Sequence, residues 1–290
     1  MTTSVERVEI TDLLWRRDEH GVAQPVRRSQ VAQRLRASGQ HRAARIVERM
    51  PAADDVLDPQ QVDAMAVTVH CELQRLSEEL QFGRRVAHLL RPEVARLRDR
   101  APGPVRVVDV GCGLGFVVRS LAHEQALGPD VELVGVDLNG ALVAEATRLA
   151  GMERLECRFV HGDAVAPGTA VDDGARTVVI SSGLLHHLPS QQLVDFFHAQ
   201  ADLGVAGFAH WDIAPCLWST VGAWVFHRAR MREPVSRHDG VLSARRAHPA
   251  VTLLAAAHAG APGYESAVLE GTRWHPRALD VLRPVVGRRA

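Results

Sequence analysis

The sequence predicts an α/β protein in which a doubly wound, mostly parallel sheet follows an N-terminal helical cap. After residue 104, short apolar and β-branched runs recur between amphipathic stretches of helical length. The first run, Val105–Val110, is mostly apolar, as strands buried on both faces of a parallel sheet are. It passes directly into closely spaced glycines and then into a helical pattern. About the first hundred residues carry helical periodicity instead.

Composition excludes several classes of function. The 290 residues have a formal net charge of zero, so no basic field indicates a nucleic-acid partner. Every cationic residue is arginine, which excludes Schiff-base chemistry and the lysine of Walker-type phosphate loops. The cysteines form no C-x-x-C pair, so we expect neither a metal site nor a disulfide framework; they are Cys71, Cys112, Cys157 and Cys216.

We expect a cytoplasmic bacterial protein with a small-molecule substrate and no nucleic-acid partner. The N-terminus lacks the pattern of a signal peptide, and no apolar run approaches the ~20 residues of a membrane helix. The Ala-, Arg- and Val-rich composition is typical of a high-GC bacterial genome. The sequence leaves a homodimer open.

The first helices are short. Residues 1–27 are polar, and Leu13, Leu14 and Trp15 are their only strong apolar anchor, so we expect a loosely packed lead-in. Helices are predicted from Ser29 to Ser38 and over residues 41–50.

A long helix should begin at Asp58-Pro59, which supplies a cap and then a first-turn proline. Apolar residues then recur every three or four positions up to Leu80. Gly83 should break the helix, and another should follow to residue 97, with Pro92 bending or restarting it. Residues 101–104 (APGP) are the predicted hinge to the sheet.

The glycine turn after the first strand has the pattern D-x-G-x-G-x-G over residues 109–115. Its alternate glycines allow a tight turn and a close approach of a ligand to the backbone. A dinucleotide fingerprint, G-x-G-x-x-G, would need a third glycine where Phe116 or Val118 stands. The turn is therefore a nucleotide-type site of another kind.

Acidic or polar residues follow the next strands as well. Asp137 ends a strand over residues 131–136, and an acid there can accept both hydroxyls of a ribose. A third strand over 155–160 leads to Gly162, Asp163 and Ala164. A fourth over 177–181 leads into the run SGLLHHLP at residues 182–189.

The later elements are a helix over 191–200, a fifth strand over 207–213 and an aromatic, histidine-rich insertion at about 214–242. Asp239-Gly240 is a turn signal, and Ser243 should cap a helix to about residue 258. The sixth and seventh strands are placed near 266–269 and 278–286 by expectation.

The glycine motif resembles the first motif of the class I S-adenosylmethionine-dependent methyltransferases. The His-His-Leu-Pro run is similar to that of the methyltransferases related to ubiquinone and menaquinone biosynthesis. The resemblance implies a seven-stranded Rossmann-like methyltransferase fold, with residues 1–103 as a helical cap that shapes the substrate pocket. Residues 104–290 would then be the cofactor-binding domain.

The resemblance also implies the cofactor, S-adenosyl-L-methionine, and its product S-adenosyl-L-homocysteine. In that family the glycine loop wraps the amino-acid portion, and the acid after strand three binds the adenine amine. The implied cofactor-binding residues are Asp109, Gly111, Cys112, Gly113, Gly115, Asp137, Leu138, Gly162, Asp163, Ala164, Ser181 and Ser182.

Histidine is the preferred base for removing a proton from a methyl acceptor, because its pKa lies near neutrality. His187 is the first candidate and His186 the second, since both follow strand four at the carboxyl edge of the sheet. His210 on strand five and His238 in the insertion come next.

We therefore expect methyl transfer to a small molecule, with an oxygen of an apolar or aromatic metabolite as the acceptor. One alternative is a cofactor-binding fold that does not methylate and serves as a cyclase, a partner subunit or a regulator. An RNA methyltransferase is another, but no Asn-Pro-Pro-aromatic run follows strand four.

Overall fold

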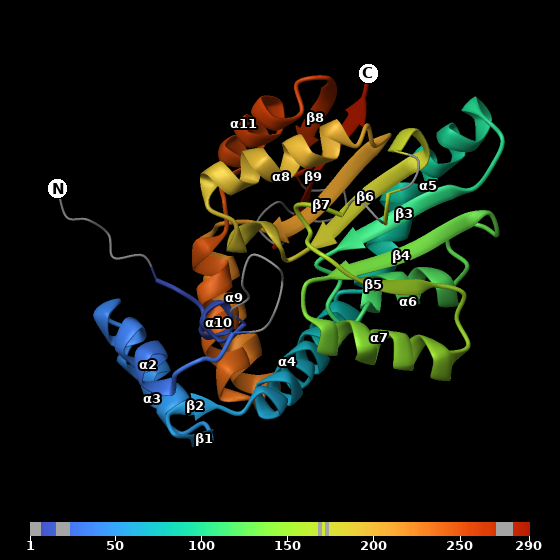
Figure 1. The fold of residues 1–290 in the computed structure, drawn as a ribbon. Helices are drawn as coiled ribbons and strands as arrows, with labels where there is room; N and C mark the ends of the chain where they lie inside the picture. Colours follow the sequence, from blue (N-terminus) through green and yellow to red (C-terminus); the bar gives the residue numbers. More distant parts are fainter. Residues whose placement is uncertain (1–6, 16–23, 168–169, 172–173, 271–280) are drawn as a thin grey trace.

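The computed structural model describes residues 7–15, 24–167, 170–171, 174–270 and 281–290. In these residues a seven-stranded sheet has the order β5-β4-β3-β6-β7-β9-β8 (Figure 1). Neighbours from β5 to β7 are parallel, and β9 runs antiparallel to both β7 and β8. The strands are β3 (Val105–Val110), β4 (Val131–Asp137), β5 (Arg158–His161), β6 (Thr177–Ser182), β7 (Gly207–Ile213), β8 (Tyr264–Val268) and β9 (Leu282–Arg289).

Both faces of the sheet are covered by helices, which confirms the predicted doubly wound α/β fold. Helices α5 (Phe82–Arg100) and α6 (Phe116–His123) pack on one face, where Val107 and Ile180 are buried. Helices α8 (Ser190–Asp202) and α11 (Ala250–Gly260) pack on the other, over Val108 and Val179. The apolar strands thus have hydrophobic neighbours on both sides.

The strand order reverses between β3 and β6, which are neighbours in the sheet. From this point the chain winds one way through β4 and β5 and the other way through β6 and β7. Open α/β sheets bind ligands outside the carboxyl ends of the strands at such a switch point. The glycine turn follows β3 at this edge, and residues 183–189 follow β6.

The cap is built from both halves of the chain and lies beside the carboxyl ends of the strands (Figure 1). Apolar side chains of the N-terminal helices form one cluster with Val235, which comes from the predicted insertion. The elements on this side are α1 (Ile10–Leu14), α2 (Arg28–Ala37), α3 (His41–Glu48), β1 (Ala52–Ala53), β2 (Val56–Leu57), α4 (Pro59–Glu79), α9 (Leu217–Arg230) and α10 (Pro234–Arg246). By contrast α5, which lies within the expected cap, packs on the sheet.

The prediction of a loose lead-in is wrong for α1. Ile10, Leu13 and Leu14 are all buried. The N-terminus of α1 is capped from α10, because the Asp239 carboxylate accepts the N–H groups of Ile10 and Thr11 at 3.0 Å each. Asp239 lies 229 residues from Ile10, so the sequence around α1 gives no indication of this contact.

Two helix boundaries differ from expectation. Gly83 lies inside α5, and the break occurs earlier, at Gln81, whose φ is 49°. A Cβ at Gly83 would lie 2.1 Å from Ser120 Oγ, so this glycine permits close packing of α5 on α6. Pro92 neither ends nor restarts α5, which continues to Arg100.

The turn predicted at Asp239-Gly240 is also wrong, because both residues lie within α10. A Cβ at Gly240 would lie 1.9 Å from the His227 ring of α9, so here glycine serves helix packing. Ser243 does not cap a helix but lies in α10, where its hydroxyl donates to the Asp239 carbonyl at 2.9 Å.

The remaining strands confirm the predicted order with shifted ends. The third strand of the chain's sheet begins at Arg158 rather than at residue 155. The last begins at Leu282, and the predicted positions 278–280 lie outside the described residues. Among the helices that the structure describes, we find none that is both long and apolar enough to cross a membrane.

Candidate functional site

The glycine turn and Asp137 form one unit at the carboxyl edge of the sheet. Gly111, Gly113 and Gly115 have φ values of 68°, 55° and 68°, in the left-handed region where glycine is favoured. The Gly113 N–H donates to Asp137 Oδ2 at 2.8 Å, and the Asn139 N–H donates to Oδ1 at 2.8 Å. The structure thus brings two predicted site residues into direct contact.

His70 of α4 lies against this turn, and sequence reasoning missed it. A Cβ at Gly113 would lie 2.6 Å from His70 Cδ2. His70 Nδ1 bonds to the Ala66 carbonyl at 2.9 Å, so Nδ1 carries the proton and Nε2 a lone pair. Burial lowers the pKa of His70, although the charge of Asp137 opposes this. His70 lies next to the apolar stripe of its helix, where the pattern gives no functional signal.

Asp109 is buried at the end of β3 with one oxygen unpartnered. Its Oδ1 has no hydrogen-bond partner among the described residues. Burial, and then the negative charge of Asp137, raise the pKa of Asp109 to about 8. Buried carboxyl oxygens without a donor are costly, so this atom marks a place for a cationic or hydrogen-bonding group of a ligand.

The adjoining rim carries the other residues predicted around the cofactor. Leu138 lies on this rim and is 43% exposed. The Gly162 N–H donates to the Asp137 carbonyl at 3.0 Å, so the loop after β5 is held beside Asp137. Asp163 is exposed there, its Oδ1 accepting the Val165 N–H at 2.9 Å, and Ala164 is half-buried next to it.

Some predicted cofactor residues turn their side chains away from this rim. The Ser181 hydroxyl bonds to His210 Nδ1 at 3.0 Å within the core. Cys112 is half-buried, and desolvation raises the pKa of its thiol well above the usual value. Its main-chain N–H donates to the Val136 carbonyl at 3.0 Å. Ser182, the last residue of β6, is half-buried. The side chains of Ser181 and Cys112 are therefore directed away from the rim and do not line it.

His210 is removed from the catalytic candidates. Its side chain is fully buried among Phe196, Phe197 and Phe208, and burial lowers its pKa to about 3. The second ring nitrogen, Nε2, bonds to Gln200 Oε1 at 3.0 Å. His210 and Asp212 lie on the same face of β7, because side chains alternate along a strand, and at His210 this face packs into the core.

His186 lies at the carboxyl edge with one nitrogen paired and one unpaired. Its Nδ1 bonds to Asp212 Oδ1 at 2.8 Å, and its main-chain N–H donates to Oδ2 at 2.6 Å. Its Nε2 is buried without a hydrogen-bond partner among the described residues and lies 4.0 Å from Glu9 Oε1. Since Nδ1 donates to a carboxylate, Nε2 carries the lone pair.

His187 repeats this arrangement with α1. Its Nδ1 bonds to Asp12 Oδ1 at 2.9 Å, and its Nε2 lies 3.8 Å from Glu9 Oε2. The two imidazole rings are 4.3 Å apart, and the His187 side chain is 31% exposed. The structure therefore joins the first two catalytic candidates, and adds Glu9 and Asp12 from a segment that the sequence did not single out.

The pKa values of the cluster's two N-terminal carboxylates, Glu9 and Asp12, shift in opposite directions. Burial raises the pKa of Glu9 to about 7, although His187 and Arg246 oppose the shift. Burial would also raise the pKa of Asp12, but hydrogen bonds and charges from His187 and Arg246 lower it to about 2. Arg246 Nη1 lies 2.5 Å from Asp12 Oδ2 and 3.3 Å from Glu9 Oε1.

His238 belongs to the contact between α10 and α1. Its Nδ1 bonds at 2.7 Å to Asp239 Oδ1, on the carboxylate that caps α1. Its Nε2 lies 3.4 Å from the Gln40 side-chain nitrogen. This candidate therefore holds the cap together and stands apart from the His186–His187 pair.

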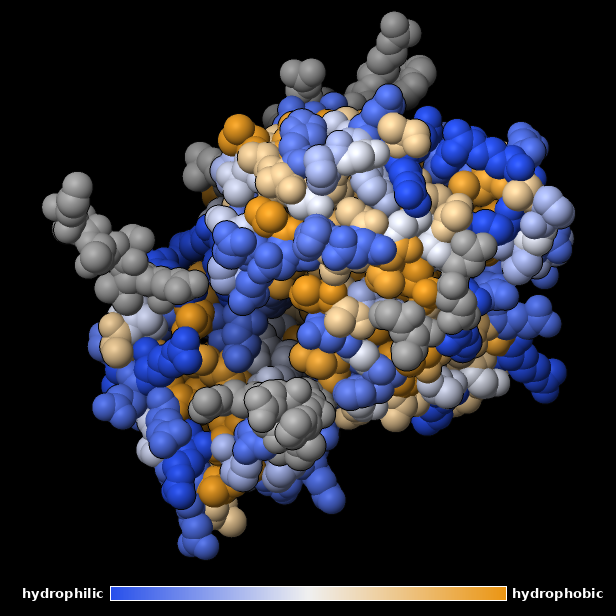
Figure 2. All heavy atoms as spheres, turned by 45° about the horizontal axis from the view of Figure 1, so that its top comes forward, coloured by the Kyte–Doolittle hydropathy of each residue, from blue (hydrophilic) through white to orange (hydrophobic). Residues whose placement is uncertain are grey.

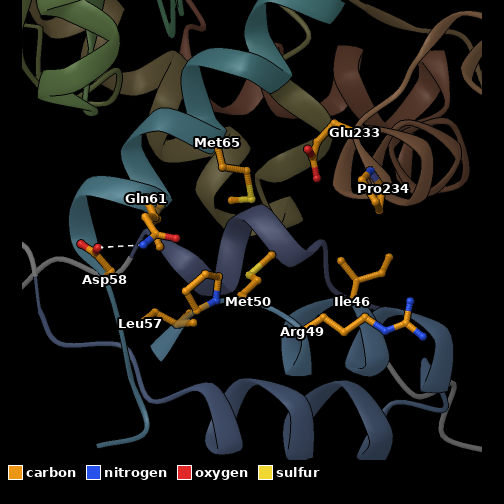
Figure 3. A pocket seen from close by; sticks show the side chains of 11 residues that line it. Ile46, Arg49, Met50, Leu57, Asp58, Gln61, Met65, Glu233 and Pro234 are labelled. Carbon is orange, nitrogen blue, oxygen red and sulfur yellow. Dashed lines mark hydrogen bonds between the residues drawn. The ribbon is translucent and has the colours of Figure 1, made fainter. Parts of the chain in front are cut away.

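The surface is hollowed between the N-terminal helices and the sheet (Figure 2). A separate cavity of about 300 Å³ lies between α3, β2, α4 and the start of α10. Met50 and Met65 point into it, and Gln61 bonds to Asp58 at its edge (Figure 3). This cavity has no lining residue from the sheet, so the switch point is the better candidate site.

Comparison with known proteins gives one family. Residues 107–203 match a model described as a methyltransferase domain. This segment runs from within β3 to the end of α8 and contains the glycine turn, Asp137, Asp163 and the His186–His187 pair. No curated protein matches the chain.

Solved structures that share the fold at a TM-score of 0.50 or more include methyltransferases. The plantazolicin methyltransferase BamL, solved with a desmethyl analogue and SAH, has a TM-score of 0.54 at 11% identity, over 78% of this chain and 96% of that one. The methyltransferase domain of bacterial CtHen1 has a TM-score of 0.50 at 14% identity, over 72% and 98%. Magnesium protoporphyrin IX methyltransferase from Synechocystis PCC 6803 is 19% identical, with a TM-score of 0.48 over 91% of this chain and 99% of that one.

Proposed function

We propose that the chain, whose residues 107–203 match a methyltransferase domain, is a class I S-adenosylmethionine-dependent methyltransferase that methylates a hydroxyl oxygen of a small, apolar or aromatic acceptor. The observation that carries this proposal is the His186–His187 pair. Both histidines stand at the switch-point edge, and in the neutral imidazole the bond from Nδ1 to a carboxylate leaves the lone pair on Nε2. They lie on the β6 side of the switch point, and the glycine turn lies on the β3 side.

The residues around the glycine turn fit the cofactor, which supplies an electrophilic methyl group on sulfur. Asp109 Oδ1 lacks a partner and would accept from the ammonium of the amino-acid portion. Asp137 accepts two main-chain N–H groups, which leaves acceptor capacity for two ribose hydroxyls. The exposed face of Leu138 would cover the adenine, and Asp163 would accept from its amine.

The acceptor would lie between the glycine turn and the histidine pair. A hydroxyl is a poor nucleophile until its proton is removed, and a base positioned within hydrogen-bond reach contributes about 10²–10⁴ in rate. His187 is the more accessible of the two, and Asp12 fixes its tautomer so that Nε2 can take the proton. His186, almost fully buried, would orient the acceptor or share this role.

Two further observations support a small, largely apolar acceptor. The chain has no net charge, so it lacks the basic field that draws nucleic acids to an enzyme. Hydrophobic side chains lie on both sides of the hollow between the N-terminal helices and the sheet, with hydrophilic ones between them (Figure 2). Apolar walls with a few polar groups are typical of small-molecule sites.

A labelled methyl donor tests the proposal. The purified protein is incubated with S-adenosylmethionine carrying a trideuteromethyl group and with small-molecule and RNA fractions of a bacterial extract. We expect label in an organic-soluble product, bound through oxygen as located by fragmentation. Label in RNA, or tight cofactor binding without any product, would overturn the proposal in favour of the RNA-modifying or non-methylating alternative.

A further inference from the structure

Three side chains from distant parts of the chain direct ligand atoms at one small space beside the proposed acceptor site. They are Glu9, just before α1, and His186 and His187, just after β6. One ligand atom of each lies within 4.8 Å of the others. A carboxylate and two imidazoles are the donors that divalent transition metals take in proteins.

Hydrogen bonds outside this space orient both imidazole rings so that Nε2 faces Glu9. His186 Nδ1 donates to Asp212 at 2.8 Å, and His187 Nδ1 donates to Asp12 at 2.9 Å. Each Nε2 therefore presents a lone pair on the side of Glu9. Metal-ligating histidines almost always donate their other N–H to a carboxylate or carbonyl, which sets the tautomer and the ring orientation.

The distances inside the space are wrong for hydrogen bonds. The two Nε2 atoms lie 4.0 Å and 3.8 Å from the Glu9 oxygens, beyond hydrogen-bond range. His186 Nε2 is also left without a partner although its side chain is only 4% exposed. Two ligands that each lie about 2.0–2.2 Å from an ion are roughly 3–4 Å apart, so small side-chain adjustments close the site.

We propose that Glu9, His186 and His187 bind one divalent transition-metal ion, with open coordination positions toward the hollow. A two-histidine, one-carboxylate set with open positions is an arrangement that iron, zinc, cobalt and manganese accept. The inference rests on the proposed methyl transfer for the ion's role, and it assigns the loss of the acceptor proton to the ion in place of His187. An ion at this place stands beside the acceptor hydroxyl and favours loss of its proton.

The surrounding charges are compatible with a dication. Glu9, Asp12 and Asp212 bring three carboxylates to the cluster, and Arg246 brings one positive charge. A fourth carboxylate, Asp239, is bonded by the N-terminus of α1. Arg246 approaches Glu9 at Oε1, while Oε2 is the oxygen nearest His187. The cluster therefore keeps an excess of negative charge when its histidines are neutral.

The methyl transfer balances without an additional reactant. The acceptor oxygen forms the bond to the methyl carbon, and the carbon–sulfur bond breaks with its electron pair going to sulfur. The hydroxyl proton leaves to solvent, because His187 Nε2 is then occupied as a ligand. The ion itself is neither oxidised nor reduced in this step.

Metal binding can be measured on the full chain without cofactor or acceptor. The chelator-treated protein is titrated with Co²⁺, whose visible absorption reports nitrogen and oxygen ligands, and then with Zn²⁺. We expect one Co²⁺ per chain, displaced by Zn²⁺, and a melting temperature that rises with either ion. Glu9→Gln and His187→Ala should each weaken binding at least tenfold.

The control is His198→Ala, which removes an exposed histidine paired with Asp202 on α8 and should bind Co²⁺ like the wild type. Circular dichroism checks that every variant is folded. If the wild type binds no stoichiometric ion and its melting temperature does not respond, the site does not exist, whatever the variants do. Equal binding by wild type, E9Q and H187A would also overturn the proposal. Neither result affects the labelled-methyl test, so failures of the two proposals are distinguishable.

Discussion

The carboxylate of Asp137, at the end of β4, accepts the main-chain N–H of Gly113 at 2.8 Å, across a separation of 24 residues. This bond joins the glycine turn after β3 to the acid of the neighbouring strand. Parallel pairing of β3 with β4 brings the turn and Asp137 together, because both carboxyl ends meet at one edge. The proposed amino-acid and ribose subsites of the cofactor therefore belong to one hydrogen-bonded unit.

Replacing Asp137 should weaken cofactor binding at least tenfold. Asp137→Ala removes the proposed ribose acceptor, and an unpaired buried hydrogen-bonding group costs about 1–3 kcal/mol. It also releases the Gly113 and Asn139 N–H groups that now define the turn. Calorimetric titration with S-adenosylhomocysteine measures the effect, and circular dichroism checks the fold. Asp202→Ala, at an exposed acid of α8, is the matched control, and unchanged affinity in Asp137→Ala would contradict the assignment.

Gly113→Val should abolish cofactor binding and leave the secondary structure native-like. Gly113 has a positive φ, which a valine rarely adopts. The added Cβ would also lie only 2.6 Å from the His70 ring. A matched change is Gly151→Ala in α7 (Gly140–Glu153), where no atom lies within 4 Å of the added Cβ, and this variant should bind normally. If Gly113→Val binds like the wild type, the cofactor does not approach this turn.

The stability of the cofactor-free protein should fall with rising pH because of Asp109. Its pKa is raised to about 8 in the folded state, above the ordinary value near 4 of an unfolded chain. A raised pKa contributes stability that is present below pH 4 and is lost as the pH rises toward 8. Asp109→Asn keeps the shape but cannot ionise, so its stability should not carry this loss.

Urea unfolding of both proteins at pH 5 and pH 8 measures this difference. The free energy of unfolding of the wild type, relative to that of Asp109→Asn, should be lower at pH 8 than at pH 5. An identical pH dependence of the two proteins would mean that Asp109 is ionised in the folded state. Saturating cofactor should reduce the difference, because a nearby ammonium favours the carboxylate.

His210→Ala should destabilise the protein without affecting the site directly. The ring is fully buried against three phenylalanines, and truncation of a large core side chain costs about 3–5 kcal/mol. Urea unfolding measures the loss, and methyl transfer per folded molecule should stay within a few-fold. A loss of turnover of 10² or more in folded protein would return His210 to the catalytic candidates.

The pKa of His210 in the folded protein is about 3, so the stability of the wild type also depends on pH in the acid range. Because this pKa is depressed, its contribution to stability is present above pH 6.5 and is lost as the pH falls toward 3. The wild type should therefore lose stability on acidification more steeply than His210→Ala. This comparison separates the ring's titration from its packing.

The sheet and its cofactor edge could be predicted because each signal is local. Val105–Val110 has a strand's composition, the glycines define the following turn, and each later acid stands at a strand end. The structure confirms these strands in order, since parallel sheets bring the ends of successive strands to one edge. His186 and His187 were found in the same way.

The cap half of the site could not be predicted because its contacts are not local. The Asp239 carboxylate bonds to the Thr11 N–H across 228 residues, and His187 bonds to Asp12 across 175. Neither acid has a spacing that marks a site, and Glu9 stands in a polar stretch like many others. His70 likewise lies beside an apolar helix stripe, and only the packing of α4 places it on the glycine turn.

His187→Ala should lower turnover by about 10²–10⁴ and leave cofactor affinity within a few-fold, because the cofactor is held by other residues. His187→Gln keeps a hydrogen-bonding side chain but cannot take a proton near neutrality. Full activity of the Gln variant with loss in the Ala variant would mean that His187 only positions the acceptor. Near-wild-type turnover in both would remove His187 from the mechanism.

If both variants lose activity, His187 is either the general base or a metal ligand. Removal of metal ions by a chelator distinguishes these two roles. If His187 Nε2 takes the proton, the wild type stays active after removal of metal ions. If Nε2 ligates an ion, chelation should abolish turnover in the wild type, and added Zn²⁺ or Co²⁺ should restore it. The variants cannot be restored by the ion, because one of its three protein ligands is gone. Restoration of His187→Ala by imidazole without metal would instead establish proton transfer.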